Sequence, residues 1–315
     1  MISSSAFALL ASAALVSAHG IVTEVTIDGK WYTGTKNWNA PENQNSPVRG
    51  IPQDTGFVHY ANVNMRSVTC SDIACSSAGY QGRPVTAPIK AGGTMGVRWG
   101  GDGGPDGKQW PHPEGPAIVY MASCNGPCKD YDPSNAQFFK IAEEGLDGSK
   151  QPNRAGNDHL PAGDGLWAQN RIQYENSYHW FTIPADIKAG EYLVRHELIS
   201  LHGAHSYAEG AQYYPACIQV KVTGGGNASP PTTPATQLYT TKDGIVDIYQ
   251  PYSKGITAQM YKIPGPPVPA ASTGKCKPKK RSMSKRVEDE TRELYDRALV
   301  HSKAARAHAK KHTSH

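Results

Sequence analysis

The chain has 315 residues, of which 38% are hydrophobic and 19% charged, and its formal net charge is +5. Residues 272–315 hold thirteen Lys and Arg against five Asp and Glu, so the body before them is mildly acidic. Nothing in that body concentrates Lys and Arg as a nucleic-acid groove requires, and we expect no nucleic-acid partner. The 32 Gly, 24 Pro and 16 Tyr are typical of an extracellular chain rich in turns and strands.

Residues 1–18 have the pattern of a removable signal peptide. An apolar stretch from Ala6 to Val16 leads to Val16-Ser17-Ala18, small residues of the kind that signal peptidase cuts after. The stretch is shorter than the roughly 18 apolar residues that a membrane-spanning helix needs. We therefore expect these residues to be removed, the protein to be secreted without a membrane anchor, and His19 to become the N-terminus.

Short apolar runs separated by Gly, Pro, Asn and Asp clusters predict a series of strands. They lie at Ile21–Ile27, Met95–Trp99, Ala117–Met121, His179–Ile183, Tyr192–His202 and Ile218–Val222. Asp28-Gly29 predicts a hairpin turn after the first strand, because both central positions of such a turn favour positive φ. The pattern predicts an all-β sandwich, immunoglobulin-like or fibronectin III-like, with long loops. We expect one domain over residues 19–271 and a basic tail over 272–315, with no Cys-rich module after the domain.

Six cysteines in a secreted chain indicate disulfides, although the sequence alone leaves their connectivity open. Cys124 and Cys128 are spaced for a local bridge across a tight turn, and we favour that pair. Asn227-Ala228-Ser229 is an N-glycosylation sequon in a Gly- and Pro-rich stretch, which we expect to be exposed.

An N-terminal histidine can chelate a metal through two nitrogen atoms. The neutral α-amine and the δ nitrogen of His19 can close a six-membered ring, and an amine pKa of about 8 lets a metal displace the proton. A third nitrogen would complete a T-shaped site, a ligand set that suits copper. His112 lies before a predicted strand, and Pro111 and Pro113 stiffen its loop as a preorganised ligand requires. An ordinary exposed loop histidine would show the same pattern.

The run from Leu201 to Cys217 places His, Gln and Tyr side chains near two strand ends. Strand alternation predicts that Gln212 and Tyr214 share one face and that Tyr213 lies on the other. A buried tyrosine with a satisfied hydroxyl is the ordinary alternative for either tyrosine.

Together these segments resemble the fungal cellulose-active lytic polysaccharide monooxygenases of auxiliary activity family nine, formerly glycoside hydrolase family sixty-one. The resemblance covers residues 19–271 and follows the family's motif order. It rests on His19-Gly20 after the signal peptide, Ser71–Cys75, His112–Pro116, Phe138–Glu143, Arg195–Ile199, Gly210–Cys217, Gly244–Tyr249 and Ile263–Pro266.

The resemblance implies one copper ion per domain, at the centre of a flat surface. His19, through its amine and side chain, and His112 would bind the metal, with Tyr214 in a long axial position. His202 and Gln212 would hydrogen-bond to the oxygen co-substrate and help to protonate it.

Further assignments follow from the same resemblance. Tyr249 would stack on a glucose unit, and the usual disulfides would be Cys75–Cys217 and Cys124–Cys128, leaving Cys70 and Cys276 without an assigned partner. His205 is a second candidate for the role given to His202. Pro113 and Glu114 stand between His112 and the Gly-Pro pair, where the family usually has one residue.

The implied activity is oxidative cleavage of β-1,4-glucans such as cellulose by a secreted monomer. An external electron donor and O2 or H2O2 would support hydrogen abstraction at C1 or C4. A conventional glycosidase would instead need two carboxylates about 5 to 10 Å apart, and no pattern pairs Asp102, Asp106 and Glu114. The alternative that remains is a non-catalytic copper- or polysaccharide-binding module.

Overall fold

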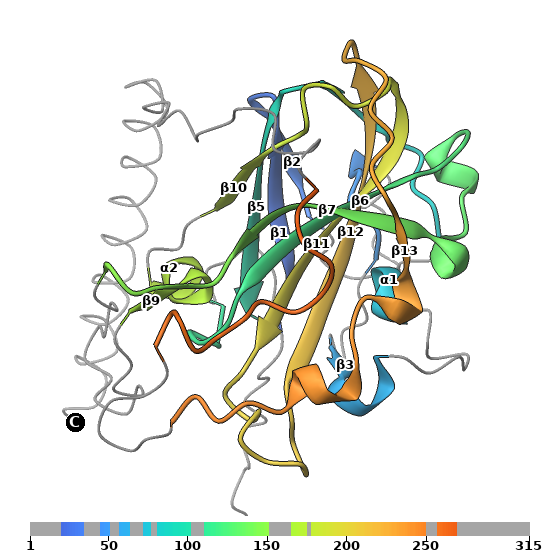
Figure 1. Ribbon diagram of the computed structural model, residues 1–315. Coiled ribbons are helices and arrows are strands. Elements are labelled where there is room, and N and C mark those ends of the chain that lie inside the picture. The colour runs from blue at the N-terminus through green and yellow to red at the C-terminus, as the bar shows by residue number, and fades with distance from the viewer. Residues whose placement is uncertain are drawn as a thin grey trace, which may run out of the picture. The chain divides into compact units, whose positions relative to one another are not determined.

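The computed structural model describes residues 20–34, 45–50, 57–63, 72–76, 81–101, 110–150, 165–174, 178–249 and 257–269 (Figure 1). His19, the expected signal peptide, the basic tail, Cys70 and Cys276 lie outside these residues. Among the helices that the structure describes, none is both long and apolar enough to cross a membrane.

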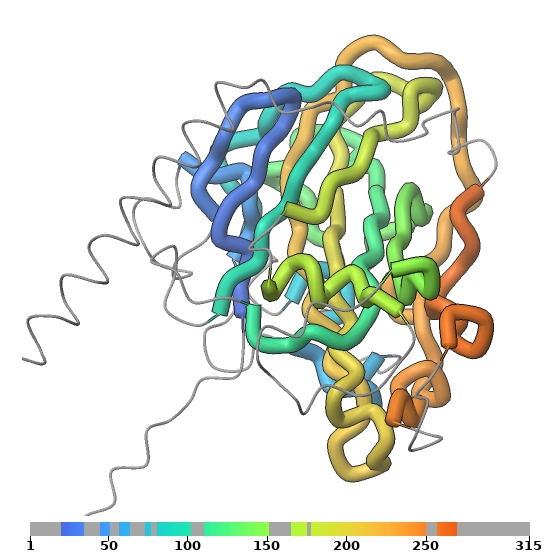
Figure 2. Tube along the Cα trace, turned by 90° about the vertical axis from the view of Figure 1, so that its left-hand side faces the viewer, coloured from blue at the N-terminus to red at the C-terminus, as the bar shows by residue number. Residues whose placement is uncertain are grey.

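Two β-sheets form the framework of the described part of the chain (Figures 1 and 2). The four-stranded sheet has the order β10-β5-β1-β2, with β10 His179–Thr182, β5 Thr94–Gly101, β1 Gly20–Ile27 and β2 Lys30–Thr33. The seven-stranded sheet has the order β13-β7-β6-β11-β12-β3, and β4 also pairs with β12. Its strands are β13 Thr233–Pro234, β7 Gln137–Glu144, β6 Ala117–Ser123, β11 Gly190–Ser200, β12 Gln212–Thr223, β3 Val58–His59 and β4 Ala87–Lys90.

The remaining described elements are short. They are the pair β8 Leu146–Asp147 and β9 Leu166–Trp167, the α-helices α1 Asp72–Cys75 and α2 Ala168–Tyr174, and five 3-10 turns. The turns span Tyr60–Asn62, Cys128–Asp130, Pro133–Asn135, Ala235–Gln237 and Thr241–Gly244.

The two sheets pack face to face, which confirms the predicted β-sandwich. One apolar cluster joins Val25 and Val97 of the four-stranded sheet to Val119, Val194 and Ile218 of the seven-stranded sheet. The alternation of buried and half-buried residues towards the end of β1 follows from this one-sided packing. The predicted hairpin after β1 is also confirmed, since Asp28 and Gly29 have φ of 48° and 82° and Ile27 pairs with Lys30.

A buried polar link also connects the sheets. Trp99 in β5 donates its indole N–H to Nδ1 of His196 in β11 over 3.0 Å, and Nε2 of His196 lies 2.9 Å from Nδ1 of His179 in β10. Burial, with His179 nearby, lowers the pKa of His196 well below its usual value, so the ring is neutral. The link fixes the ring of Trp99 between the sheets.

The outer face of the seven-stranded sheet is covered by residues from the end of the domain. Leu238, Tyr239 and Ile248 pack with Tyr120 and Phe138 in a second apolar cluster. Because both faces are covered, β6 and β11 are buried along almost their whole length. The strand β7 was not predicted, and its sequence contains a charged residue, Lys140, that is buried at hydrogen-bond distance from Glu143 and the carbonyl of Pro264.

An ion pair lies inside this second cluster. The guanidinium of Arg195 donates 2.5 Å and 2.7 Å hydrogen bonds to the two carboxylate oxygens of Glu197, and also bonds to the carbonyl of Ile73. Tyr239 donates its hydroxyl to Glu197. Neither charged side chain is exposed, so each depends on the other for its charge balance.

Two disulfides are present among the described residues, and they are the two expected pairs. Cys75 of α1 bonds to Cys217 of β12, and Cys124 bonds to Cys128 across a turn. Asn227 of the sequon is exposed, as predicted.

Replacing Glu197 with Gln should leave Arg195 as an uncompensated buried charge. We expect the Glu197→Gln variant to lose about 3–5 kcal/mol of unfolding free energy in urea titrations. Asp130→Asn, which breaks the exposed pair with Lys129, is the control and should change stability by less than about 1 kcal/mol. Equal stability of the two variants would contradict this account of the ion pair.

Candidate functional site

Five strand ends meet at one end of the sandwich. β1 begins there at Gly20, β5 ends at Gly101, β6 begins at Ala117, β11 ends at Ser200 and β12 begins at Gln212. Within each sheet the antiparallel register brings these ends together, because Gly20 pairs with Gly101 and Ser200 pairs with Gln212. In Figure 2 the yellow connection between β11 and β12 lies at the same lower end as the start of the blue strand β1.

Trp110 is the buried centre of this end. Its ring lies 4.9 Å from Tyr214, 5.3 Å from His112 and 5.4 Å from Trp99, between ring centroids, with edge-to-face geometry in each case. A Cβ on Gly20 would lie 2.5 Å from the same indole ring, so only glycine fits there. Trp110 therefore fixes His112, Tyr214 and the start of β1 relative to one another.

The loop that carries His112 is held by backbone hydrogen bonds. The N–H of Leu201 donates to the carbonyl of Glu114 over 3.1 Å, and the N–H of Ile199 donates to the carbonyl of Pro116 over 3.2 Å. The residues Pro113 and Glu114, which depart from the family pattern, are accommodated within this loop. His112 is only 6% exposed, so the alternative of an ordinary exposed loop histidine is wrong.

Gln169 of α2 secures this loop from the other side. Its Oε1 accepts from the Trp110 indole at 3.0 Å and from the Ser200 hydroxyl at 2.9 Å. Its Nε2 donates to the carbonyls of Pro116 and Ile199 at 2.9 and 2.8 Å. No local motif surrounds Gln169, and its partners are far away along the chain, so it was not predicted as a site residue.

Tyr214 and Gln212 share one face of β12, as the alternation predicts. The Tyr214 hydroxyl lies 3.2 Å from Nε2 of His112 and donates to Oε1 of Gln212 at 2.5 Å. Burial raises the pKa of Tyr214 above its usual value, so its phenol stays protonated at neutral pH. The alternative that Tyr214 is only a buried tyrosine with a satisfied hydroxyl accounts for its bond to Gln212. It does not explain why the hydroxyl also approaches His112.

His202 and His205 occupy different environments. The ring of His202 stacks on that of His112, with centroids 4.1 Å apart and planes inclined by 7°. Its carbonyl accepts from the Tyr249 hydroxyl at 3.2 Å. His205 is exposed, and its ring meets the edge of the Tyr249 ring, with centroids 5.3 Å apart. The structure thus brings His202, and not His205, to His112.

Two further residues at this end were not predicted as site residues. Glu114 is buried, and burial raises the pKa of its carboxyl to about 7. Tyr207, in the connection between β11 and β12, is 79% exposed, and its carbonyl accepts from the Tyr60 hydroxyl. The available signal for Tyr207 was its place in the run from Leu201 to Cys217, between two predicted strands. Asp102 and Asp106 lie outside the described residues.

The donor atoms present fit part of a copper site. Among the described residues, no group of three or more His, Cys, Asp or Glu side chains could hold a metal ion. This part of the chain supplies an imidazole nitrogen of His112 and a neutral phenol oxygen of Tyr214, 3.2 Å apart. Imidazole is a copper ligand, and a phenol oxygen is a weak one, so more nitrogen donors are needed. Gly20, the residue after His19, packs against the ring of Trp110.

The chain matches a known family along most of its length. The model of Auxiliary Activity family 9, formerly GH61, matches residues 19–261. The AA9 family lytic polysaccharide monooxygenase AA17 of Aspergillus oryzae is 37% identical over 264 residues, which cover 82% of this chain and 94% of that relative.

Solved structures agree with this match. Cel61B from Hypocrea jecorina, a glycoside hydrolase family 61 member, aligns with a TM-score of 0.64 and 29% identity over 79% of this chain and 100% of its own. A cellulose-active polysaccharide monooxygenase from M. thermophila aligns with a TM-score of 0.60 and 30% identity over 79% of this chain and 98% of its own.

Replacing Gln169 with Met should loosen the loop that carries His112. The variant keeps the side-chain size but leaves the Trp110 indole, the Ser200 hydroxyl and two carbonyls without their partner, so we expect a loss of at least about 3 kcal/mol. Hydrogen exchange at the amides of Ile199 and Leu201, which donate to the loop carbonyls of Pro116 and Glu114, should also become faster. Gln137→Met, at an exposed position, is the control, and unchanged exchange in Gln169→Met would show that Gln169 does not hold the loop.

Proposed function

Because the chain belongs to Auxiliary Activity family 9, whose members are copper-dependent lytic polysaccharide monooxygenases, we propose that it cleaves β-1,4-glucans such as cellulose at C1 or C4. An external reductant and O2 or H2O2 are the proposed co-substrates. The cellulose-active relative from M. thermophila supports the choice of glucan. The mature protein is proposed to be secreted, monomeric and to begin at His19.

One observation carries this proposal, namely the approach of the Tyr214 hydroxyl to Nε2 of His112 beside Gly20. His112 would bind the copper, and Tyr214 would be a weak ligand at its side. The amine and the imidazole of His19, which lies outside the described residues, would supply the other nitrogens. When bound, copper supplies one-electron redox chemistry with the reductant and the oxygen co-substrate.

The protein groups around the metal have separate tasks. Tyr214, whose pKa is raised by burial, stays a neutral phenol and so adds no negative charge. Its bond to Gln212 fixes the amide of that half-buried side chain at the edge of the site. The imidazole of His202 can hold or release a proton, and its stacking on His112 fixes the plane of both rings. His202 and Gln212 are therefore the proposed hydrogen-bonding groups for the oxygen co-substrate.

Two tyrosines are proposed to contact the polysaccharide. Tyr249 is half-buried and is oriented by its bond to the His202 carbonyl, while the ring of Tyr207 is open to solvent. Aromatic rings combine a large apolar surface with a polar tip, which matches the apolar faces and hydroxyls of glucose. Both rings belong to the end of the sandwich that carries His112.

The proposal is tested by His112→Ala, with His205→Ala as the control. Oligosaccharides released from amorphous cellulose by the copper-loaded protein, ascorbate and H2O2 are analysed by mass spectrometry. We expect oxidised products to fall by more than about 100-fold in His112→Ala and to stay within about twofold of the wild type in His205→Ala.

Other outcomes separate the competing functions. Unoxidised oligosaccharides from the wild type would point to a hydrolase. Tight copper binding with no product from cellulose or xyloglucan would favour a non-catalytic binding module.

The role of the N-terminal amine has its own test. A mature protein with one alanine added before His19 converts this amine into an amide, which removes one nitrogen ligand. We expect copper affinity, measured by isothermal titration calorimetry on the metal-free protein, to fall by at least about tenfold. The same affinity with and without the added alanine would exclude the amine as a ligand.

A further inference from the structure

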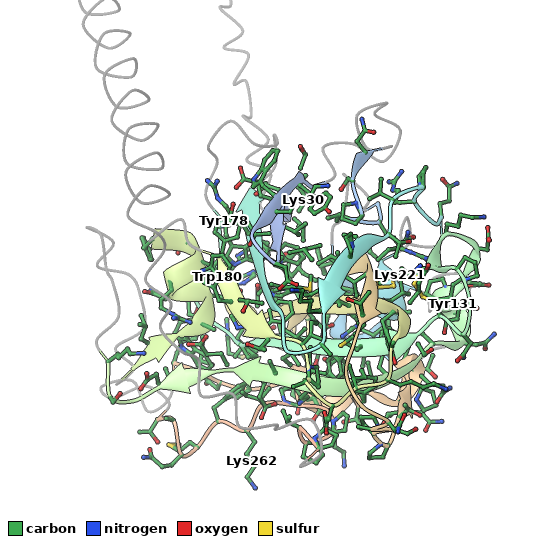
Figure 3. All side chains as sticks on the ribbon, turned by 90° about the horizontal axis from the view of Figure 1, so that it is seen from above. Lys30, Tyr131, Tyr178, Trp180, Lys221 and Lys262 are labelled. Atoms are coloured by element: carbon green, nitrogen blue, oxygen red, sulfur yellow. A yellow bond between two sulfur atoms is a disulfide. The ribbon has the colours of Figure 1, made fainter. Side chains whose placement is uncertain are left out.

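The outer face of the four-stranded sheet carries a second group of aromatic side chains. Trp31 of β2 is 53% exposed and Trp180 of β10 is 49% exposed. Tyr178 precedes β10 and lies close to Trp180 in Figure 3, and the two ring centroids are 5.3 Å apart. We call Trp31, Tyr178 and Trp180 the aromatic strip.

The strip crosses the whole sheet. Trp31 pairs with Thr26 of β1, Thr26 pairs with Gly96 of β5, and Gly96 pairs with Trp180. The backbones that carry the two tryptophans are therefore three strand spacings apart, about 14 Å. Tyr178 contacts the ring of Trp180, and its hydroxyl is close enough to Trp31 for that side chain to affect its pKa. The three side chains form one continuous surface.

The strip is fixed by its surroundings. A Cβ on Gly96 would lie 2.8 Å from two atoms of the Trp180 ring, so the ring rests on the backbone at this glycine. The Tyr178 hydroxyl donates to Glu24 at 2.5 Å, and Arg98 donates to the same carboxylate oxygen at 3.0 Å. Rigid rings lose little conformational entropy when a ligand binds.

The chemistry of the strip selects an uncharged ligand with apolar faces and hydroxyl groups. Glu24, which accepts from the Tyr178 hydroxyl, is paired with Arg98, so the two charges offset one another beside the strip. Half-exposed rings offer flat apolar surface, and the carboxylate and the tyrosine hydroxyl can hydrogen-bond to a ligand at its edge. Sugar rings have this combination of apolar faces and hydroxyls.

The strip is too small for a stable protein interface. An aromatic side chain buries at most about 150–250 Å². Three partly covered rings therefore offer far less than the roughly 800 Å² per partner of a standard protein–protein interface. The size fits a few sugar units better than a second copy of the chain.

We propose that the aromatic strip is a second binding site for a β-1,4-glucan chain. The identity of the glucan rests on the proposed function. Thr26 lies six residues after Gly20, or about 20 Å along β1, so the strip is remote from His112 and Tyr214. A glucan chain bound there would not contact the metal centre and would hold the enzyme at the polymer.

The test compares the copper-loaded full chain with the double variant Trp31→Ala/Trp180→Ala. Binding to microcrystalline cellulose is measured by depletion from solution, without reductant so that no cleavage occurs. We expect about tenfold weaker binding of the double variant, because two stacking rings are lost. Met260→Ala, another exposed apolar position, is the control and should bind like the wild type. Trp31→Phe/Trp180→Phe, which keeps both rings, should retain most of the binding.

Each outcome separates this proposal from the proposed function. Urea unfolding establishes that the variants are folded, and oxidised products from a soluble cello-oligosaccharide report on the metal centre alone. If the double variant binds cellulose as well as the wild type and still forms products, the strip proposal is overturned. It is also overturned if the wild type is a dimer and the double variant is not. An absence of oxidised products from every variant would overturn the proposed function, while the binding data would still test the strip.

Discussion

The packing of Trp110 is the constraint on which the site depends. This one buried ring contacts His112, Tyr214 and Trp99, and it leaves no room for a side chain at Gly20. Its indole N–H is satisfied by Gln169, which a buried polar group requires. The His112 loop, the first strand and β12 therefore share one contact point, and a shift of any of them must move the others.

The ring of Trp110 also connects the site to the buried polar link between the sheets, through Trp99. Trp99 contacts Trp110 on one side and donates to His196 on the other, so the spacing of the two sheets is fixed close to the site. Because His196 is neutral, its buried ring needs no charged partner. Rigid strands thus hold the loops that carry His112 and His202.

Elements whose signals are local in the sequence were predicted. Elements that depend on contacts between distant residues were missed. The Asp28-Gly29 hairpin and the strand around Val119 follow from turn residues and apolar runs. β7 was missed because Lys140 interrupts its apolar pattern, and its charge is balanced by contacts that form only in the fold. In the site, motif order predicted His112 and Tyr214, which the structure brings within 3.2 Å of one another, whereas Gln169 acts through partners that are distant in sequence and no local pattern could reveal it.

The cover over the seven-stranded sheet affects the order in which the protein can fold. Arg195 and Glu197 are sealed from water by Tyr239, which is made more than forty residues later. While the chain is being synthesised, β11 and β6 can pair, but their ion pair stays open to water until that segment emerges. The sandwich can therefore reach its final packing only when nearly the whole domain has left the ribosome. Folding of the domain is thus expected to be completed only after Tyr239 has emerged, late in synthesis, when the strand that carries Cys217 can also meet Cys75.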